Sequence, residues 1–461
     1  MNAPATPRSR RQVLASGAVG ATLGLAGCLS TLTGPSDPPR VVDGASCGAD
    51  LPPPSATASG GWTMAGHDAG ATGHNPAVDA SSAPGAPAWT VTLPAGQAPA
   101  SPVVGEDRVY VSVANYDPTP AETRLVAYAL ADGARLWERD LPYADPTVPA
   151  LAPDGDGSGT LYVVSGQDEG TTEPGTGVVL ALDPATGDER WRWPLDRRLA
   201  GPPVVAGRRV YVTSTPYGDT AVHALDPTDG TELWSRGTGP VLHVAPTVAG
   251  DTVFTSTGRD RLGALDATDG TVIWDRDVPA DDTRPVVDAA RGHVLLGFDR
   301  GLTAYCADTG ERAWTLVTTN PDTDEADYLG VVTEPVVTED LLVVQTDDTS
   351  PSELGALGHL YGLDPATGRV EWHHGDWHPA GPAVGAGDGT LIARNLPGDD
   401  EDGLGVPWRH PPGSDVADGT VAWTLDAAWR PVAVGANRML GVRGDTASAS
   451  EPVDVGCFRF S

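Results

Sequence analysis

Residues 181–191 read Ala-Leu-Asp-Pro-Ala-Thr-Gly-Asp-Glu-Arg-Trp. The apolar start of this stretch is typical of a β-strand, the Asp-Pro-Ala-Thr-Gly part is typical of a tight hairpin loop, and the tryptophan begins a new strand. Its Gly-x-x-x-Trp step occurs seven times, at Gly133/Trp137, Gly187/Trp191, Gly230/Trp234, Gly270/Trp274, Gly310/Trp314, Gly368/Trp372 and Gly419/Trp423. Successive tryptophans lie 40 to 58 residues apart. This period is typical of propeller blades and exceeds that of most helical and leucine-rich repeats.

Each repeat unit contains four short strand patterns. From its Trp, a unit runs through a Pro-Val-Val-like strand, a Val-Tyr-Val-like strand and an Ala-Leu-Asp strand to the glycine turn before the next Trp. The chain has 57 Gly and 43 Pro among 461 residues, and no segment past the N-terminus shows apolar residues at helical spacing. An all-β fold made of short strands and tight turns is the prediction.

The repeated glycines have a structural explanation. Each one is the last residue of a short hairpin loop, where a positive φ lets a type I turn rejoin the strand ladder. The seven turn glycines are therefore expected to shape the turns, and no catalytic role is assigned to them.

An eighth unit begins at Trp89, ahead of the seven Gly-x-x-x-Trp steps. The last unit, which starts at Trp423, ends without a strand after its Ala-Leu-Asp equivalent. Residues 89–93, Trp-Thr-Val-Thr-Leu, can supply that strand and close the ring, which would remove the exposed sheet edges. We predict an eight-bladed β-propeller of four-stranded antiparallel blades over residues 61–461. The expected docking tryptophans are Trp89, Trp137, Trp191, Trp234, Trp274, Trp314, Trp372 and Trp423.

The motif Ala-Leu-Asp-x-x-Thr-Gly-x-x-x-Trp resembles the tryptophan-docking repeat of the pyrroloquinoline-quinone (PQQ) propeller family. The lead-in of residues 62–76, Trp-Thr-Met-Ala-Gly-His-Asp through Thr-Gly-His-Asn-Pro, is similar to that of exported PQQ-like propeller proteins. We interpret His67 and His74 within it as hydrogen-bonding residues of the ring closure. The resemblance covers about residues 62–461 and is much stronger evidence for the fold than for an activity.

The N-terminus carries an export signal. Arg10 and Arg11, in Ser-Arg-Arg-Gln-Val-Leu, resemble a twin-arginine motif, and the apolar run that follows is too short to span a membrane as a helix. The run ends in Leu-Ala-Gly-Cys, which resembles a lipobox, so residues 1–27 are expected to be a cleaved signal peptide and Cys28 the lipidated first residue. An exported protein, anchored on the extracytoplasmic side of the membrane, is the resulting prediction.

Residues 28–60 are rich in Pro, Ser and Gly and are predicted to be a tether between the anchor and the propeller. Three cysteines remain after Cys28 is set aside, so at most one disulfide can form. A Cys47–Cys457 bridge from the tether to the closing blade is one hypothesis. Cys306 is expected to pack as a small buried apolar residue.

The charge is strongly negative. There are 62 acidic residues against 29 basic ones, all of them Arg, which gives a net charge of −33. Nucleic acid and anionic membrane surfaces are excluded as partners because phosphate binding needs clustered cations. An acidic surface without Lys resembles proteins adapted to high salt, such as those of halophilic archaea, where counterions screen the self-repulsion.

Two clusters have the residue types of metal sites. Asp154, Asp156 and Ser158 match the opening of a calcium loop, although Ser165 stands where the loop's closing Glu belongs. His374, Asp376 and His378 would share one face of a strand and could bind zinc or copper. The alternatives are a solvated hairpin loop for the first cluster and solvent-facing histidines for the second, and no metal is expected.

The resemblance implies two kinds of function. Quinoprotein dehydrogenases of the family cover PQQ with a ring formed by two adjacent cysteines, hold calcium with Glu and Asn and use an Asp base, and this chain has no Cys-Cys pair. It is also similar to non-catalytic propeller lipoproteins, such as one that assists outer-membrane protein assembly. We therefore expect a monomeric, non-catalytic scaffold or binding protein that recognises another protein at the cell surface. Its partner would be selected by the long loops 318–330 and 398–412. A PQQ-dependent dehydrogenase and a cell-surface sugar or metal binder stay open as alternatives.

Overall fold

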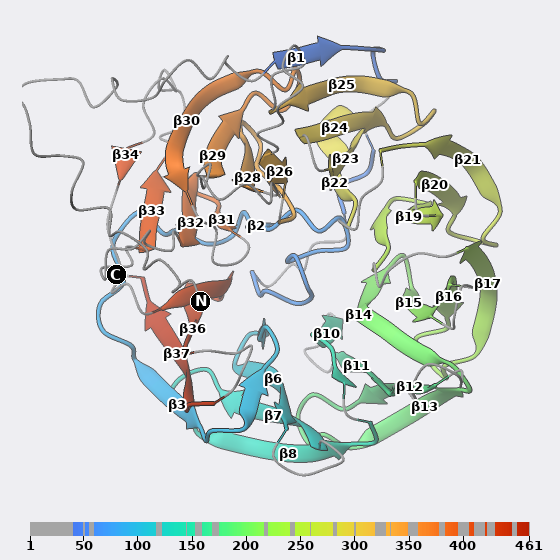
Figure 1. The fold of residues 1–461 in the computed structure, drawn as a ribbon. Coiled ribbons are helices and arrows are strands. Elements are labelled where there is room, and N and C mark those ends of the chain that lie inside the picture. The colour runs from blue at the N-terminus through green and yellow to red at the C-terminus, as the bar shows by residue number, and fades with distance from the viewer. Residues whose placement is uncertain are drawn as a thin grey trace, which may run out of the picture. The chain divides into compact units, whose positions relative to one another are not determined.

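The fold is that of a computed structural model of the chain. It describes residues 40–48, 51–54, 60–116, 122–143, 145–152, 159–167, 175–215, 220–239, 245–258, 260–279, 284–298, 301–318, 329–331, 333–348, 358–377, 383–394, 405–409, 420–421, 429–444 and 450–460. Within these residues the strands form eight sheets, whose blade strands pair antiparallel and which are arranged as the blades of an eight-bladed β-propeller (Figure 1). The predicted fold class is confirmed.

Blades 1 to 4 follow one another in chain order. Blade 1 contains β4 (Gln97–Pro99), β5 (Val103–Val104), β6 (Arg108–Asn115), β7 (Glu122–Ala129) and β8 (Arg135–Leu141). Blade 2 contains β9 (Asp145–Pro146), β10 (Ala150–Ala152), β11 (Thr160–Gln167), β12 (Thr176–Leu182) and β13 (Glu189–Leu195). Blade 3 contains β14 (Arg198–Ala206), β15 (Arg209–Thr215), β16 (Thr220–Leu225) and β17 (Glu232–Gly239). Blade 4 contains β18 (Thr247–Ala249), β19 (Thr252–Gly258), β20 (Arg261–Asp266) and β21 (Val272–Asp277).

Blades 5 to 7 complete the sequential part of the ring. Blade 5 contains β22 (Val286–Asp288), β23 (His293–Phe298), β24 (Gly301–Cys306) and β25 (Arg312–Val317), with a 3-10 helix η2 (Ala289–Arg291) between its first two strands. Blade 6 contains β26 (Leu329–Val331), β27 (Val336–Val337), β28 (Leu342–Asp348), β29 (Gly358–Leu363) and β30 (Val370–Trp377). Blade 7 contains β31 (Val384–Ala386), β32 (Thr390–Arg394), β33 (Gly405–Arg409) and β34 (Thr420–Val421), and β2 (His74–Asn75) pairs parallel with β31.

Blade 8 closes the ring with strands from both ends of the propeller sequence. It contains β35 (Arg430–Gly435), β36 (Arg438–Arg443), β37 (Val453–Arg459) and, as its outermost strand, β3 (Trp89–Leu93). Strand β3 runs antiparallel to β37, with Trp89 opposite Cys457 and Leu93 opposite Val453 (Figure 1). The N-terminal strand therefore completes the last blade, as predicted.

Neighbouring blades are held together by the tryptophan of one unit and the turn glycine of the next. A Cβ placed on Gly187 would lie 2.8 Å from the Trp137 ring, and one on Gly270 would lie 2.7 Å from the Trp234 ring. The six described turn glycines, at 133, 187, 230, 270, 310 and 368, have φ between 69° and 77°. Trp234 Nε1 also donates a hydrogen bond to Ala267 O in that next turn, at 2.9 Å. The flat ring fits against this turn only because the glycine has no side chain.

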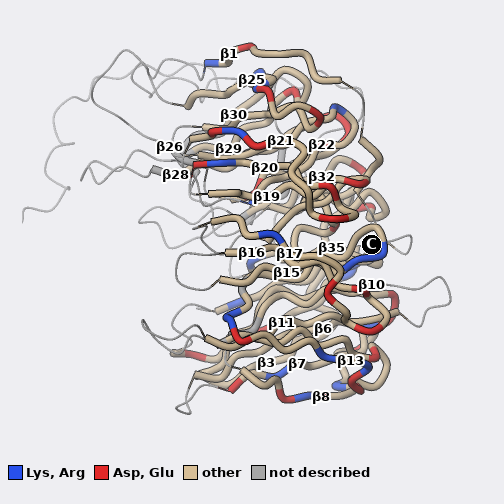
Figure 2. Tube along the Cα trace, turned by 90° about the vertical axis from the view of Figure 1, so that its right-hand side faces the viewer, with Lys and Arg blue, Asp and Glu red and all other residues tan. Residues whose placement is uncertain are grey.

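The apolar core lies between the blades. One cluster combines Val103, Tyr110 and Leu125 of blade 1 with Leu161 and Leu180 of blade 2. The outer strands carry the charge, as the red and blue residues along β8 and β13 show (Figure 2). No helix among the described residues is long and apolar enough to cross a membrane.

Part of the predicted tether is instead attached to the propeller. Strand β1 (Arg40–Asp43) adds to the outer edge of blade 5, antiparallel to β25, with Arg40 opposite Val317 (Figure 1). Leu51 N donates a hydrogen bond to Ala289 O of the same blade, at 2.9 Å. The Pro-rich composition of residues 28–60 hid this strand, because its Val-Val core is short.

The cysteine prediction is wrong in its pairing. Cys47 is bonded to Cys306, with the two Cα atoms 4.9 Å apart, and Cys457 is a buried free thiol. Strand β1 pairs with the outer edge of blade 5, so the residues that follow it bring Cys47 next to Cys306 at the end of β24. Cys457 lies in β37 of blade 8, between β36 and β3.

Candidate binding site in the propeller channel

The lead-in, residues 60–78, runs around the inside of the propeller and hydrogen-bonds to the innermost strands of seven blades. In four blades the same backbone position of the inner strand donates to it: Leu151 to Thr63 O at 2.7 Å, Val248 to Ala69 O at 2.7 Å, Val287 to Gly70 O at 2.9 Å and Val337 to Thr72 O at 2.8 Å. In the other three blades, Val104 exchanges two hydrogen bonds with Trp62, Gly385 donates to Gly73 O, and Ala436 donates to Gly60 O.

This arrangement solves a problem that every propeller has at its axis. The innermost strand of a blade has a sheet partner on one side only, so the N–H groups on its other side need acceptors. The lead-in carbonyls provide them. The lead-in therefore acts as a built-in plug of the channel, and the resemblance seen in its sequence has a structural basis.

Polar side chains fix the shape of the lead-in. Buried Asp68 accepts hydrogen bonds from Gly70 N, Thr72 N and Thr72 Oγ1, at 2.9, 3.2 and 2.5 Å. Asn75 Nδ2 lies 2.8 Å from Val434 O of blade 8 and 2.9 Å from Gly60 O. His67 and Ala71 have φ of 76° and 57°, which is rare for residues with a side chain and marks a segment held in place by its surroundings.

Both lead-in histidines lie within hydrogen-bond distance of a partner, but neither of these partners belongs to blade 8, which closes the ring. His67 Nδ1 lies 3.3 Å from Asp68 Oδ2, and His74 Nε2 lies 3.2 Å from Ala386 O of blade 7. Burial lowers the pKa of His74 below its ordinary value. A neutral imidazole donating to Ala386 O fits this environment.

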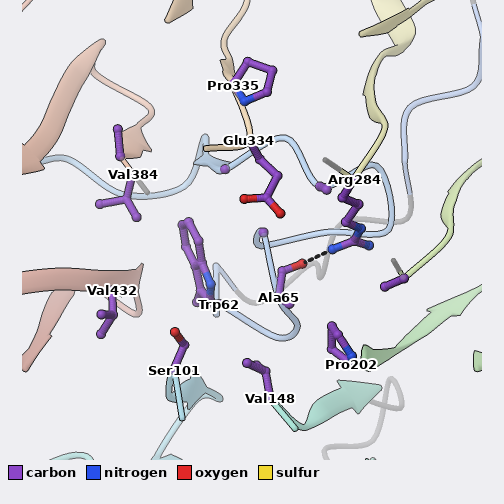
Figure 3. Close-up of a pocket in the computed structure, with 15 residues that line it drawn as sticks. Trp62, Ala65, Ser101, Val148, Pro202, Arg284, Glu334, Pro335, Val384 and Val432 are labelled. Atoms are coloured by element: carbon purple, nitrogen blue, oxygen red, sulfur yellow. Dashed lines mark hydrogen bonds between the residues drawn. The ribbon is translucent and has the colours of Figure 1, made fainter. Parts of the chain in front are cut away.

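A cavity of about 280 Å³ opens beside the lead-in at the channel axis (Figure 3). The lead-in contributes Trp62, and all eight blades contribute wall residues. These are mostly small or apolar and include Ser101, Val148, Pro202, Ala245, Val384 and Val432. In the described part of the chain, the charged side chains that line it are Arg284 of blade 5 and Glu334 of blade 6.

Most of these wall residues share one position of the repeat. The inner strand of each blade follows an x-Pro pair, and the residue before this proline is Ser101, Val148, Pro202, Ala245, Arg284 or Glu334 in the first six blades. The two residues after the proline lie in the inner strand, whereas the residue x lines the cavity. Sequence reasoning missed this site because it treated the Pro-Val-Val pattern only as a strand. The signal that could have revealed it is a charged residue at x, where packing requires none.

Arg284 is the most unusual side chain of the site. It is 7% exposed and donates to Ala65 O through Nη1 and to Pro246 O through Nη2, both at 3.0 Å (Figure 3). Its Nε is buried with no hydrogen-bond partner among the described residues. Burial lowers the pKa of the guanidinium to about 10, while the charges of Glu334 and Asp68 oppose the shift. The guanidinium therefore stays charged at neutral pH.

The other predicted site residues divide into three groups. Trp89, Trp137, Trp191, Trp234, Trp274, Trp314 and Trp372 lie at blade contacts away from the axis. His374 and Asp376 lie in β30, on the outer side of blade 6, and the described residues contain no group of three metal-binding side chains. Outside the described residues lie Arg10, Arg11, Cys28, Asp154, Asp156, Ser158, His378, Gly419 and Trp423, as do most of the loops 318–330 and 398–412.

The cavity does not match the residues that the resemblance implies for PQQ. That cofactor carries three carboxylates, and Arg284 is the one cation among the described lining residues of the cavity. Among the described residues, no asparagine or aspartate lines it together with Glu334, and the Cys47–Cys306 bridge belongs to the outer part of blade 5. We therefore assign no reaction step through a quinone.

The fold and the site together define the chain as a propeller whose channel is occupied by its own lead-in. A family model described as "Outer membrane protein assembly factor BamB" matches residues 49–154, 121–245 and 218–376. The chain belongs to this family of PQQ-like propellers. No curated protein matches the sequence significantly.

Solved structures with the same fold include both enzymes and an assembly factor. The quinohemoprotein alcohol dehydrogenase ADHIIG from Pseudomonas putida HK5 aligns with a TM-score of 0.59 at 13% identity, covering 89% of this chain and 83% of the enzyme. BamB from Moraxella catarrhalis aligns with a TM-score of 0.51 at 17% identity, covering 80% of this chain and 100% of BamB. The quinohemoprotein alcohol dehydrogenase from Comamonas testosteroni aligns with a TM-score of 0.58 at 13% identity, covering 87% and 81%. At these identities the likeness concerns the fold alone.

Proposed function

We propose that this protein is a non-catalytic, lipid-anchored extracytoplasmic propeller that binds another protein at the outer face of the membrane. The family model named after an assembly factor supports a binding role for the ring. The twin-arginine motif at Arg10 and Arg11 and the lipobox Cys28 support export and anchoring. The lack of fit between the channel residues and PQQ weighs against the dehydrogenase alternative.

The observation that carries the proposal is a set of exposed apolar side chains on the outer strands of blades 3 and 4. Leu233 in β17 and Val272 and Ile273 in β21 are 46%, 39% and 51% exposed. They make up three of the five large apolar side chains that are exposed in the described part of the chain, and the two strands belong to adjacent blades. Single exposed apolar residues are normal on a surface, but three of them on adjacent outer strands of an acidic protein favour these strands as the contact site.

The proposal is tested by crosslinking on intact cells with the double variant Leu233→Ser/Ile273→Ser. Leu136→Ser is the matched control, since Leu136 is 46% exposed at the equivalent position before the docking Trp of blade 1. We expect the double variant to lose a specific crosslinked protein and Leu136→Ser to keep it. An unchanged crosslink pattern in the double variant would refute this surface as the contact site.

Anchoring has its own test. Replacement Cys28→Ser removes the thiol that the lipid would occupy, so the folded propeller should appear in the medium instead of the membrane fraction. Immunoblotting of both fractions measures this. Retention of the variant in the membrane fraction would contradict a lipid anchor at this residue.

A further inference from the structure

Two opposite charges face the channel cavity without forming an ion pair with each other. Arg284 and Glu334 belong to adjacent blades, and among the described residues no salt bridge joins them within 4.0 Å. In the close-up, the Glu334 carboxylate points into the cavity between Trp62 and Arg284 (Figure 3). The cavity thus has a cationic and an anionic end.

The cationic end of the cavity is deeply buried, since Arg284 is 7% exposed. Two backbone carbonyls accept from Arg284, but Nε lacks a partner among the described residues, and a buried charge is costly unless an opposite charge is in contact with it. The equivalent positions of blades 1 to 4 hold Ser101, Val148, Pro202 and Ala245, so the fold forms its inner strands without a cation there. An anionic group in the cavity would complete the surroundings of Arg284.

The size and walls of the cavity limit what can enter. Its volume of about 280 Å³ is near the lower end of ligand sites, which run from roughly 300 to 1,000 Å³, and far above the ~30 Å³ of one water. Val148, Val384, Val432 and the ring of Trp62 line the cavity together with the two charges. A ligand of a few heavy atoms with a short apolar part fits this description.

We propose that the channel cavity binds a small zwitterion, such as an α-amino acid or a betaine, with its carboxylate on Arg284 and its ammonium group towards Glu334. A simple anion would meet the repulsion of Glu334, and a simple cation would meet that of Arg284, whereas a zwitterion satisfies both. The Trp62 ring adds a surface that attracts an ammonium or quaternary ammonium group. This binding is independent of the protein partner proposed above, since the outer strands of blades 3 and 4 do not line the cavity.

The test is equilibrium dialysis of the whole folded propeller with radiolabelled L-alanine and glycine betaine at high salt. Propionate and ethylamine serve as the anion-only and cation-only analogues of alanine. We expect saturable binding of at least one zwitterion at one site per chain and at least tenfold weaker binding of both analogues. Absence of saturable zwitterion binding at millimolar protein, or propionate binding as tight as that of alanine, would overturn the proposal.

Single substitutions test whether the zwitterion binds between Arg284 and Glu334. Glu334→Gln keeps the shape of an exposed side chain and should weaken zwitterion binding at least tenfold while improving the relative binding of propionate. Glu339→Gln removes an exposed acid on the turn after β27 and should change nothing. Arg284→Gln should abolish binding, and if it fails to fold, Glu334→Gln alone still decides. Equal affinities in wild type and Glu334→Gln would contradict this location.

Discussion

The turn glycines show how single residues determine the contact between two blades. Gly270 combines a φ of 73° with a Cβ position only 2.7 Å from the Trp234 ring of the preceding blade. The first property could be predicted from the hairpin loop. The second could not, because the tryptophan that needs the space precedes the glycine by 36 residues in the chain.

A glycine series separates the two effects. Gly270→Ala should lower the unfolding free energy by about 1–2 kcal/mol for the left-handed backbone and by a further ~1–3 kcal/mol for overpacking against Trp234. Gly207→Ala, with φ 54° and nothing within 4 Å of its Cβ, should show the first cost alone. Gly237→Ala, which also has open space and no positive φ, should be nearly neutral. Urea unfolding measures the loss of unfolding free energy in each variant. Equal losses at Gly207 and Gly270 would contradict the packing role of Gly270.

Protonation of His74 in the lead-in is expected to make the folding stability depend on pH. Its pKa is lowered chiefly by burial, so the unfolded chain binds a proton more readily than the folded one. The stability from the neutral ring is therefore fully present above the unfolded pKa of about 6.5 and is lost as the pH falls through 6.5 towards the folded pKa.

The variant His74→Gln removes this titration while keeping an N–H donor for Ala386 O. Its stability should fall less than that of the wild type between pH 8 and pH 5. Thermal unfolding of both proteins across this range, referenced to their difference at pH 8, gives the comparison. Parallel pH curves would show that His74 does not contribute.

At the scale of elements, the strands that repeat in every blade could be predicted from the sequence, whereas contacts that occur only once could not. Every blade repeats the same strand pattern, so the ring and its closure by β3 follow from the sequence. The lead-in and β1 occur once each, and their partners lie up to several hundred residues away: Asn75 contacts Val434, and Arg40 pairs with Val317. Neither contact repeats, so no spacing in the sequence reports it.

The Cys47–Cys306 bridge fixes β1 to blade 5 across a separation of 259 residues. Cys47→Ser should lower stability by roughly 2–5 kcal/mol, as loss of a native disulfide typically does, and should expose the segment before residue 60 to protease. Non-reducing peptide mass spectrometry of the wild type should find the Cys47 and Cys306 peptides joined. A Cys47–Cys457 peptide would contradict the structure. In the control Cys457→Ala, the 47–306 link should persist.

For the whole molecule, the charge sets the conditions under which the ring is stable. A net charge of −33 concentrates negative charge on one folded body, while the described ion pairs, such as Arg139 with Glu189, engage only some of the acids. Repulsion between the remaining carboxylates opposes the compact state. The screening length falls from ~10 Å at 0.1 M salt to ~3 Å at 1 M, so added salt should relieve this repulsion.

The melting temperature should therefore rise steeply between 0.1 and 1 M KCl, since the folded ring brings its carboxylates closer together than the unfolded chain does. Sucrose at equal osmolality is the control, because it is excluded from protein surfaces without screening charge. A further control is pH 4.5, where partial protonation of the carboxylates reduces the net charge and the salt effect should shrink. If sucrose matches KCl, or if the melting temperature does not change with KCl, repulsion between carboxylates does not limit the stability of the ring. The adaptation to high salt inferred from composition would then lose its physical basis.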